Sequence, residues 1–261
     1  MASDKKARRI AVISGKGGVG KTVITANLAS ALASSGQRVL VLDADLGLAN
    51  LDIILGLDPK RTIQDIFQGT CRPDDALIQT AKGFDLLPAG SGLQENTVLS
   101  KNLAEKMEAL LSSLEERYDI ILFDAGAGVG EVVLFFAALA HRILVVVTPE
   151  PTSLMDAYAS IKVLKQLYKR NEFLLVVNQA NPENPDRIGT SVTRHLQGVI
   201  SKFVDVGTSP PVFLQLIGSL PLDPAIPRSV RNRQLLSETQ PPAASVCFVN
   251  TMADCLRKTM I

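Results

Sequence analysis

The sequence predicts an α/β fold, with a mostly parallel, twisted sheet of about seven or eight strands and helices on both faces. Short apolar runs rich in β-branched residues alternate with longer amphipathic stretches almost to the end of the chain. Most of the short runs are apolar without alternation, which is typical of strands that are buried on both faces. A glycine-rich turn joins the first run to the first amphipathic stretch, as in sheets whose ligands bind at the carboxyl ends of the strands.

Each expected element follows from its own pattern in chain order. Strands are expected at residues 9–14, 38–45, 84–90, 118–126, 142–150, 173–179 and 213–221. Helices are expected at residues 21–35, 100–117, 129–140, 152–170, 187–203, 224–236 and 244–259. Residues 244–261 form a C-terminal amphipathic segment whose apolar stripe is Val249, Met252, Leu256 and Met260. Such a stripe favours an outer helix packed on the domain over a membrane anchor.

The composition fits a single domain over residues 1–261, with residues 1–8 as an N-terminal extension, because no linker or repeat interrupts the chain. The 27 basic and 26 acidic residues nearly balance, which disfavours DNA as a partner. The three cysteines show no paired spacing, and no apolar run approaches the ~20 residues of a membrane span. A soluble cytoplasmic protein is therefore expected.

The stretch SGKGGVGKT, residues 14–22, fits the phosphate-binding pattern G-x-x-x-x-G-K-[ST] between a strand and a helix. Its glycines let several backbone N–H groups point at one anion, and the positive end of the following helix faces the same anion. Lys21 adds charge near the outer phosphates, and the Thr22 hydroxyl is placed to ligate Mg²⁺. The expected nucleotide contacts in this loop are Gly15, Lys16, Gly17, Gly18, Val19, Gly20, Lys21, Thr22 and Val23.

Three aspartates, Asp43, Asp45 and Asp124, close expected buried strands and are expected at the same edge of the sheet as the loop. Asp124 is positioned to hold Mg²⁺ through a water, so Thr22, Asp45 and Asp124 form the expected metal set. Asp43 and Asp45 share one face of their strand, where one orients the attacking water and the other holds the loop or the metal shell. The alternative is that Asp124 only caps the next helix and that Asp43 and Asp45 only cap the turn that follows them.

Base recognition is indicated by the end of the strand at residues 173–179. Guanine-specific sites carry N-K-x-D, whereas this strand ends in NQAN, residues 178–181, with no aspartate in the last place. Asn178 can both donate to and accept from an adenine edge, so ATP is favoured over GTP.

These motifs resemble the MinD/ParA class of P-loop ATPases, whose deviant Walker A loop carries an early lysine, here Lys16. The segments DADLGLANLDIILGL, residues 43–57, and EPTSLMDAYASIKVLK, residues 150–165, are similar to the FlhG family (FleN, YlxH). The resemblance implies that Lys16 reaches the phosphates of a partner subunit across an ATP-sandwiched homodimer. It implies that Asp45, Lys16 and Lys21 are catalytic. The further nucleotide contacts that it implies are Asn178, Pro221, Asp223 and Glu150.

The family pattern implies a slow ATP-hydrolysing switch that sets flagellar number and placement. Its implied partners are an FlhF-type GTPase, proteins of the flagellar switch complex or a flagellar transcription activator. The family also implies peripheral contact with the inner face of the cell membrane. The family's D-Q-A element is absent from the first residues, MASDKKARR, which weakens the case for FlhF activation. Two alternatives share the same chemistry: a ParA-like DNA-partitioning ATPase and a MinD-like division-site ATPase.

Overall fold

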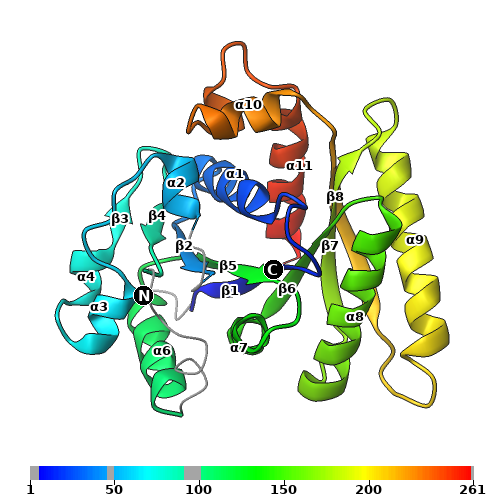
Figure 1. Ribbon diagram of the computed structural model, residues 1–261, viewed down its shortest axis with the longest axis horizontal. Helices are drawn as coiled ribbons and strands as arrows, with labels where there is room; N and C mark the ends of the chain where they lie inside the picture. Colours follow the sequence, from blue (N-terminus) through cyan, green and yellow to red (C-terminus); the bar gives the residue numbers. More distant parts are fainter. Residues whose placement is uncertain (1–5, 46–49, 91–100, 260–261) are drawn as a thin grey trace.

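The computed structural model describes residues 6–45, 50–90 and 101–259, and their strands form one eight-stranded sheet (Figure 1). The strands are β1 (Arg8–Ser14), β2 (Val39–Ala44), β3 (Ile78–Gln79), β4 (Asp85–Leu87), β5 (Ile120–Ala127), β6 (Arg142–Val147), β7 (Glu172–Ala180) and β8 (Phe213–Pro221). Their order is β3-β4-β2-β5-β1-β6-β7-β8. The β3–β4 pairing is antiparallel and the other pairings are parallel.

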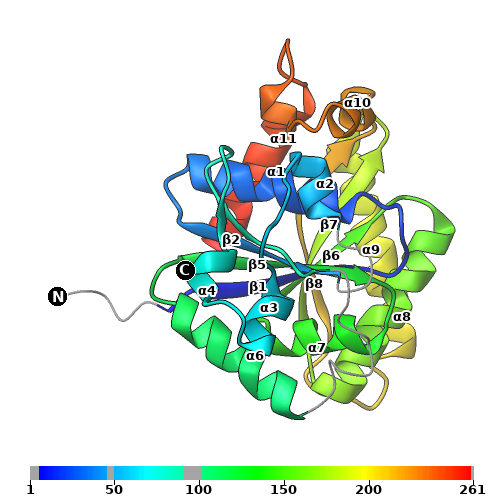
Figure 2. The ribbon, with the colours of Figure 1, turned by 60° about the vertical axis from the view of Figure 1, so that its left-hand side comes forward.

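Helices cover both faces of this sheet (Figures 1 and 2). One face carries α1 (Lys21–Ser34), α2 (Leu51–Leu55), α10 (Ala225–Arg231), the short 3₁₀ helix η1 (Leu236–Glu238) and α11 (Ser245–Lys258). The other carries α6 (Lys101–Leu114), α7 (Glu131–Leu139), α8 (Pro151–Tyr168) and α9 (Pro185–Phe203). The short helices α3 (Ile63–Gln68) and α4 (Pro73–Ala76) lie at the β3 end of the sheet. The predicted fold class is confirmed.

The central strand β1 shows why the apolar runs do not alternate. Ile10 and Val12 belong to the core on the α1 side, whereas Ala11 and Ile13 belong to the core on the α7 and α8 side. All four side chains are fully buried, because each face of the strand is covered by helices. On the second face, Phe123 of β5 meets Phe136 of α7 with 5.4 Å between ring centroids.

The C-terminal helix α11 is packed on the sheet, as its stripe predicted. Val249, Met252 and Leu256 are buried against β8 and α1, while Met260 lies outside the described residues. Gly218 of β8 allows this approach, because a Cβ added there would lie 2.3 Å from the Met252 Cγ. In the described part of the chain, no helix is long and apolar enough to cross a membrane.

Replacing Gly218 by alanine is expected to lower the free energy of unfolding by about 1–3 kcal/mol, because the new methyl group overpacks the contact with Met252. Urea denaturation followed by circular dichroism measures the change. Gly198→Ala is the matched control: a Cβ there meets no atom within 4 Å, and alanine favours the α9 helix. Equal stability of the two variants would contradict the close packing of α11 on β8.

Sequence patterns missed the shortest elements and one helix end. The strand β3 and the helices α2, α3, α4 and η1 contain two to six residues, too few for a period to emerge. The helix expected at residues 224–236 ends at Arg231, because Arg233 takes a left-handed conformation with φ 55° that turns the chain out of the helix.

Candidate functional site

The glycine loop leaves the carboxyl end of β1 and leads directly into α1, as predicted (Figure 1). Gly18 and Gly20 have φ values of 78° and 88°, which side-chain-bearing residues rarely adopt. A Cβ added at Gly17 or Gly18 would meet nothing within 4 Å, so the backbone here borders open space. A loop of this shape at a helix N-terminus fits the triphosphate of a nucleotide.

Neighbouring elements fix the two ends of the loop. At Gly15 an added Cβ would lie 2.3 Å from the Asp156 carbonyl carbon, because the loop packs directly on α8. At the other end, the Asn178 amide donates a 2.7 Å hydrogen bond to the Val19 carbonyl. Asn178 therefore supports the loop, a function that the sequence did not predict, and its contact with adenine stays a prediction.

Lys21 of the loop is ion-paired inside the protein. Its ammonium lies 2.9 Å from Asp124 Oδ1, which also accepts a 2.9 Å hydrogen bond from the Thr25 hydroxyl. Lys21 is 8% exposed and Asp124 1% exposed, so the pair is shielded from water. Sequence reasoning missed Thr25, although it lies one helical turn after Lys21 and thus on the same face of α1.

Asp43 lies beside Asp124, because β2 and β5 pair in register at these residues. Burial raises the pKa of Asp43 from its ordinary 3.8 to about 7, and the charge of Asp124 adds to the rise. Its carboxylate accepts hydrogen bonds from the backbone N–H of Asp45 (3.2 Å) and Leu51 (3.3 Å). Asp43 was considered either for orienting the attacking water or for holding the loop or the metal shell. Its bonds to Asp45 and Leu51 favour a holding function, because they anchor residues that follow β2.

Asp45 lies at the same edge of the sheet, one residue beyond β2. Its carboxyl carbon is 3.7 Å from where a Cβ of Gly126 would be, so Asp45 lies beside the glycine-rich turn at the end of β5. The loop, Asp45 and Asp124 are thus brought to one place by three neighbouring strands, β1, β2 and β5.

Lys16 contacts the beginning of α8 in its own subunit. Its ammonium lies 2.6 Å from Glu150 Oε2 and 3.0 Å from the Thr152 hydroxyl. The lysine side chain remains 31% exposed, so it lies at the surface of the sheet edge. The sequence placed Lys16 and Glu150 at this edge but did not predict that they touch, and it did not identify Thr152.

Asp223 binds its own chain. Its Oδ1 accepts a 2.8 Å hydrogen bond from the Ala225 N–H, and its Oδ2 accepts a 2.6 Å bond from the Ser245 hydroxyl. Burial acts to raise the pKa of Asp223, but the hydrogen bonds from Ser245 and Ala225 outweigh it and lower the pKa. The carboxylate therefore joins the beginnings of α10 and α11, and adenine contacts by Asp223 and Pro221 stay predictions.

The side chains at this edge could hold Mg²⁺ together with a bound nucleotide. Among the described residues, no group of three His, Cys, Asp or Glu side chains could hold a metal ion. Mg²⁺ at phosphate loops is usually held by one or two protein groups together with phosphates and waters. Thr22, Asp45 and Asp124, at the ends of the loop, β2 and β5, could supply that smaller number.

Comparison with known proteins agrees with this geometry. A model of the AAA domain family matches residues 7–176. The antiactivator FleN of Pseudomonas aeruginosa is 39% identical over 249 residues, which cover 95% of this chain and 86% of FleN. The flagellum site-determining protein YlxH of Helicobacter pylori is 33% identical over 237 residues, which cover 89% of this chain and 76% of YlxH.

Among solved structures, the septum site-determining protein MinD of Pyrococcus horikoshii, complexed with Mg-ADP, matches with a TM-score of 0.75 and 26% identity. That match covers 97% of each chain. The residues matched by the family model, 7–176, include the loop, Asp43, Asp45 and Asp124. The chain therefore belongs to the MinD/ParA class of P-loop ATPases, among the FlhG-like relatives of FleN and YlxH.

Proposed function

We propose that the chain is a switch that dimerises when it binds ATP. Hydrolysis of ATP to ADP and phosphate then separates the dimer into monomers. The observation that carries this proposal is a set of exposed apolar side chains at the edge of the sheet that also carries the glycine loop. Ile53, Val129, Met155 and Leu222 are large, exposed hydrophobic residues that follow four different strands at the carboxyl edge of the sheet. Exposed apolar side chains around a charged site are typical of a surface that a partner covers.

Two lysines divide the phosphate contacts in this proposal. Lys21 is buried beside the loop and neutralises charge within its own subunit, whereas Lys16 lies at the exposed edge and reaches the nucleotide of the partner. Asp45 orients the attacking water, and Asn178 keeps the loop in its shape. Thr22, with Asp45 and Asp124, would hold a Mg²⁺ ion, which would neutralise charge at the phosphates.

The relatives support a proposal for the cellular function. FleN is an antiactivator and YlxH determines the site of flagella, so this chain is proposed to control flagellar number and placement. Its partners would be an FlhF-type GTPase, the flagellar switch complex or a flagellar transcription activator. In this proposal the dimer works in the cytoplasm and at the inner face of the membrane.

Lys16→Ala tests the switch. The variant should bind ATP with a Kd within about threefold of the unmodified protein, because an exposed ion pair contributes little within the subunit. Its ATP-dependent dimer should weaken by at least about tenfold, measured by light scattering with a non-hydrolysable ATP analogue. Lys60→Ala, which removes another exposed, ion-paired lysine, is the control. Normal ATP-dependent dimers of Lys16→Ala would overturn the proposal.

A further inference from the structure

The beginning of α8 holds Lys16 within its own subunit, although the proposed switch needs this lysine at the nucleotide of a partner subunit. Its ammonium lies 2.6 Å from Glu150 Oε2 and 3.0 Å from the Thr152 hydroxyl. Lys16 belongs to the glycine loop, whereas the other two residues lie where the chain passes from β6 into α8. An ATP-dependent dimer therefore has to break this contact once in each subunit.

The backbone at Lys16 is fixed, whereas its side chain has room to change partners. The Lys16 carbonyl accepts a 2.9 Å hydrogen bond from the Ser14 hydroxyl, and Ser14 is buried. The preceding residue, Gly15, packs so closely on α8 that an added Cβ would lie 2.3 Å from the Asp156 carbonyl carbon. By contrast, the Lys16 side chain is 31% exposed and the Glu150 side chain 60% exposed. Lys16 can therefore move between two partners by rotation of its side chain.

The N-terminus of α8 makes the charge of Glu150 necessary for this contact. Glu150 is the N-cap residue of the helix, which has 18 residues. A helix N-terminus carries partial positive charge, which attracts a carboxylate and repels an ammonium. Without the Glu150 charge, this end of α8 would repel Lys16, and the Thr152 hydroxyl would be a weaker, neutral partner. When Lys16 leaves, Glu150 keeps its favourable position at the helix N-terminus, so the contact opens at little cost.

We propose that Glu150 and Thr152 form a latch, which holds Lys16 in the monomer and competes for it with the nucleotide of the partner subunit. This inference rests on the proposed switch, because it concerns the regulation of the same lysine. A triphosphate carries more negative charge than one carboxylate, so it takes Lys16 when two ATP-bound subunits meet. ADP carries less charge, so Glu150 recovers Lys16 after hydrolysis. The latch thus raises the protein concentration that dimerisation requires and favours separation after hydrolysis.

Glu150→Gln tests the latch, because glutamine keeps the size of the side chain and removes its charge. The dimer formed with a non-hydrolysable ATP analogue should tighten by about three- to tenfold. A single exposed ion pair is weak, but two latches open for each dimer and their effects multiply. Light scattering over a range of protein concentrations gives the dimer Kd. An unchanged Kd would overturn the proposal, and so would a weaker dimer, which would instead make Glu150 a contact of the partner's nucleotide.

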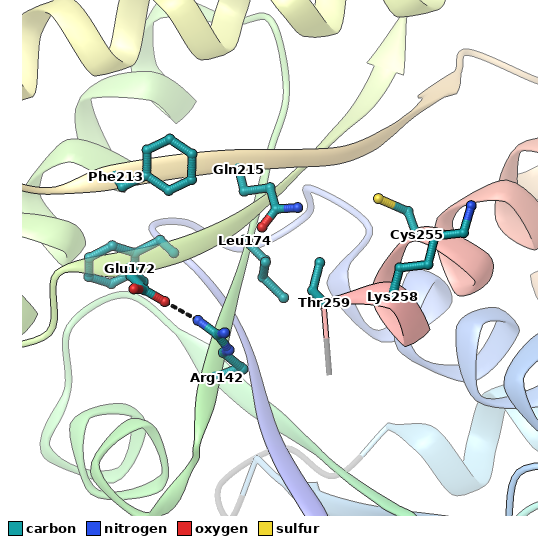
Figure 3. A pocket seen from close by; sticks show the side chains of 9 residues that line it. Arg142, Glu172, Leu174, Phe213, Gln215, Cys255, Lys258 and Thr259 are labelled. Atoms are coloured by element: carbon teal, nitrogen blue, oxygen red, sulfur yellow. Dashed lines mark hydrogen bonds and ion pairs between the residues drawn. The ribbon is translucent and has the colours of Figure 1, made fainter. Parts of the chain in front are cut away.

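Two matched variants separate the latch from a general change of charge. Glu172 forms an ion pair of nearly equal exposure with Arg142, but at the opposite edge of the sheet, where both residues border a cavity of about 400 Å³ (Figure 3). Glu183 is an exposed glutamate that follows β7 at the same edge as Glu150. Glu172→Gln and Glu183→Gln should both leave the dimer Kd within about twofold of the unmodified protein. Equal tightening by Glu183→Gln would attribute the effect to net charge and refute the latch.

A double variant tests whether Glu150 acts through Lys16. In a Lys16→Ala background, Glu150→Gln should no longer tighten the dimer, because no ammonium remains to be released. Tightening that persists in the double variant would show that Glu150 acts by another route, and the latch would be rejected.

A measurement on the monomer distinguishes failure of the latch from failure of the switch. Without nucleotide, an amine-reactive reagent should label Lys16 about two- to fivefold faster in Glu150→Gln, as followed by mass spectrometry, because the ammonium is no longer held. Labelling of Lys60, which pairs with Asp58, should not change. Unchanged labelling of Lys16 would overturn the latch. Faster labelling in a protein that forms no ATP-dependent dimer would support the hold on Lys16 and overturn the proposed function instead.

Discussion

Replacing Asp45 by alanine is expected to slow ATP hydrolysis by about 10²-fold or more, the range that a positioned catalytic carboxylate commonly contributes. The residue lies just beyond β2 and beside Gly126, next to the loop that would hold the phosphates. Because the loop itself is unchanged, the variant should bind ATP normally and remain dimeric long after addition of ATP. Phosphate release and size-exclusion chromatography with light scattering measure the two effects.

The control for this prediction is Asp58→Ala. Asp58 is an exposed aspartate whose side chain pairs with Lys60, so its removal changes the net charge by the same amount without touching the site. Turnover of Asp45→Ala equal to that of the control would remove Asp45 from the mechanism.

Replacing Lys21 by alanine is expected to abolish ATP binding and to lower the free energy of unfolding by about 3–5 kcal/mol even without nucleotide. The lysine is the cation beside two buried carboxylates, Asp124 and Asp43. Without it, both carboxylates are left in a low-dielectric region with only hydrogen bonds to stabilise their charge. Urea denaturation measures the loss of stability, and isothermal titration calorimetry measures the loss of ATP binding.

The stability loss in Lys21→Ala should depend on pH. A carboxylic acid whose pKa is raised by folding favours the folded state most below its unfolded pKa, and this contribution is lost as pH rises through the folded pKa. For Asp43 that window runs from 3.8 to about 7 in the unmodified protein, and loss of Lys21 extends it upward. The destabilisation should therefore be smaller near pH 5 than near pH 8.

Lys165→Ala is the matched control, because Lys165 is also a buried lysine and, among the described residues, it bonds to the neutral oxygens of Asn171 and Pro210 alone. Its removal should destabilise the protein to a similar extent at both pH values. A pH-independent loss in Lys21→Ala would contradict the buried charge cluster.

The sequence predicted the parts of the site that depend on a local motif or on the shared direction of parallel strands. The glycine loop, its strand and its helix were predicted together, because the motif requires that order of elements. Asp45 and Asp124 were correctly expected at one edge, since parallel strands bring their carboxyl ends together. Strand order was not predicted, because residues as far apart in sequence as Asp43 and Asp124 become neighbours only through long-range pairing.

Side-chain partners were the least predictable part of the site. Lys16 touches Glu150 only because β1 and β6 are neighbours, a contact that spans 134 residues of sequence. The adenine contact of Asp223 stays a prediction, but its bonds to the first residues of α10 and α11 were not predicted, because they join segments 22 residues apart in sequence. The bond from the Asn178 amide to the Val19 carbonyl was also not predicted, and the contact of Asn178 with adenine stays a prediction.

The tight packing at Gly15 and the bond from Asn178 to Val19 have a kinetic consequence. Contacts with α8 and β7 fix both ends of the glycine loop. Nucleotide binding would therefore require little ordering of the loop backbone. In the proposed mechanism, the Lys21 ammonium would exchange Asp124 for a phosphate when the nucleotide binds, and the Lys16 ammonium would exchange Glu150 for a phosphate of the partner when the dimer forms. Such a swap of counter-ions makes the association rate sensitive to ionic strength.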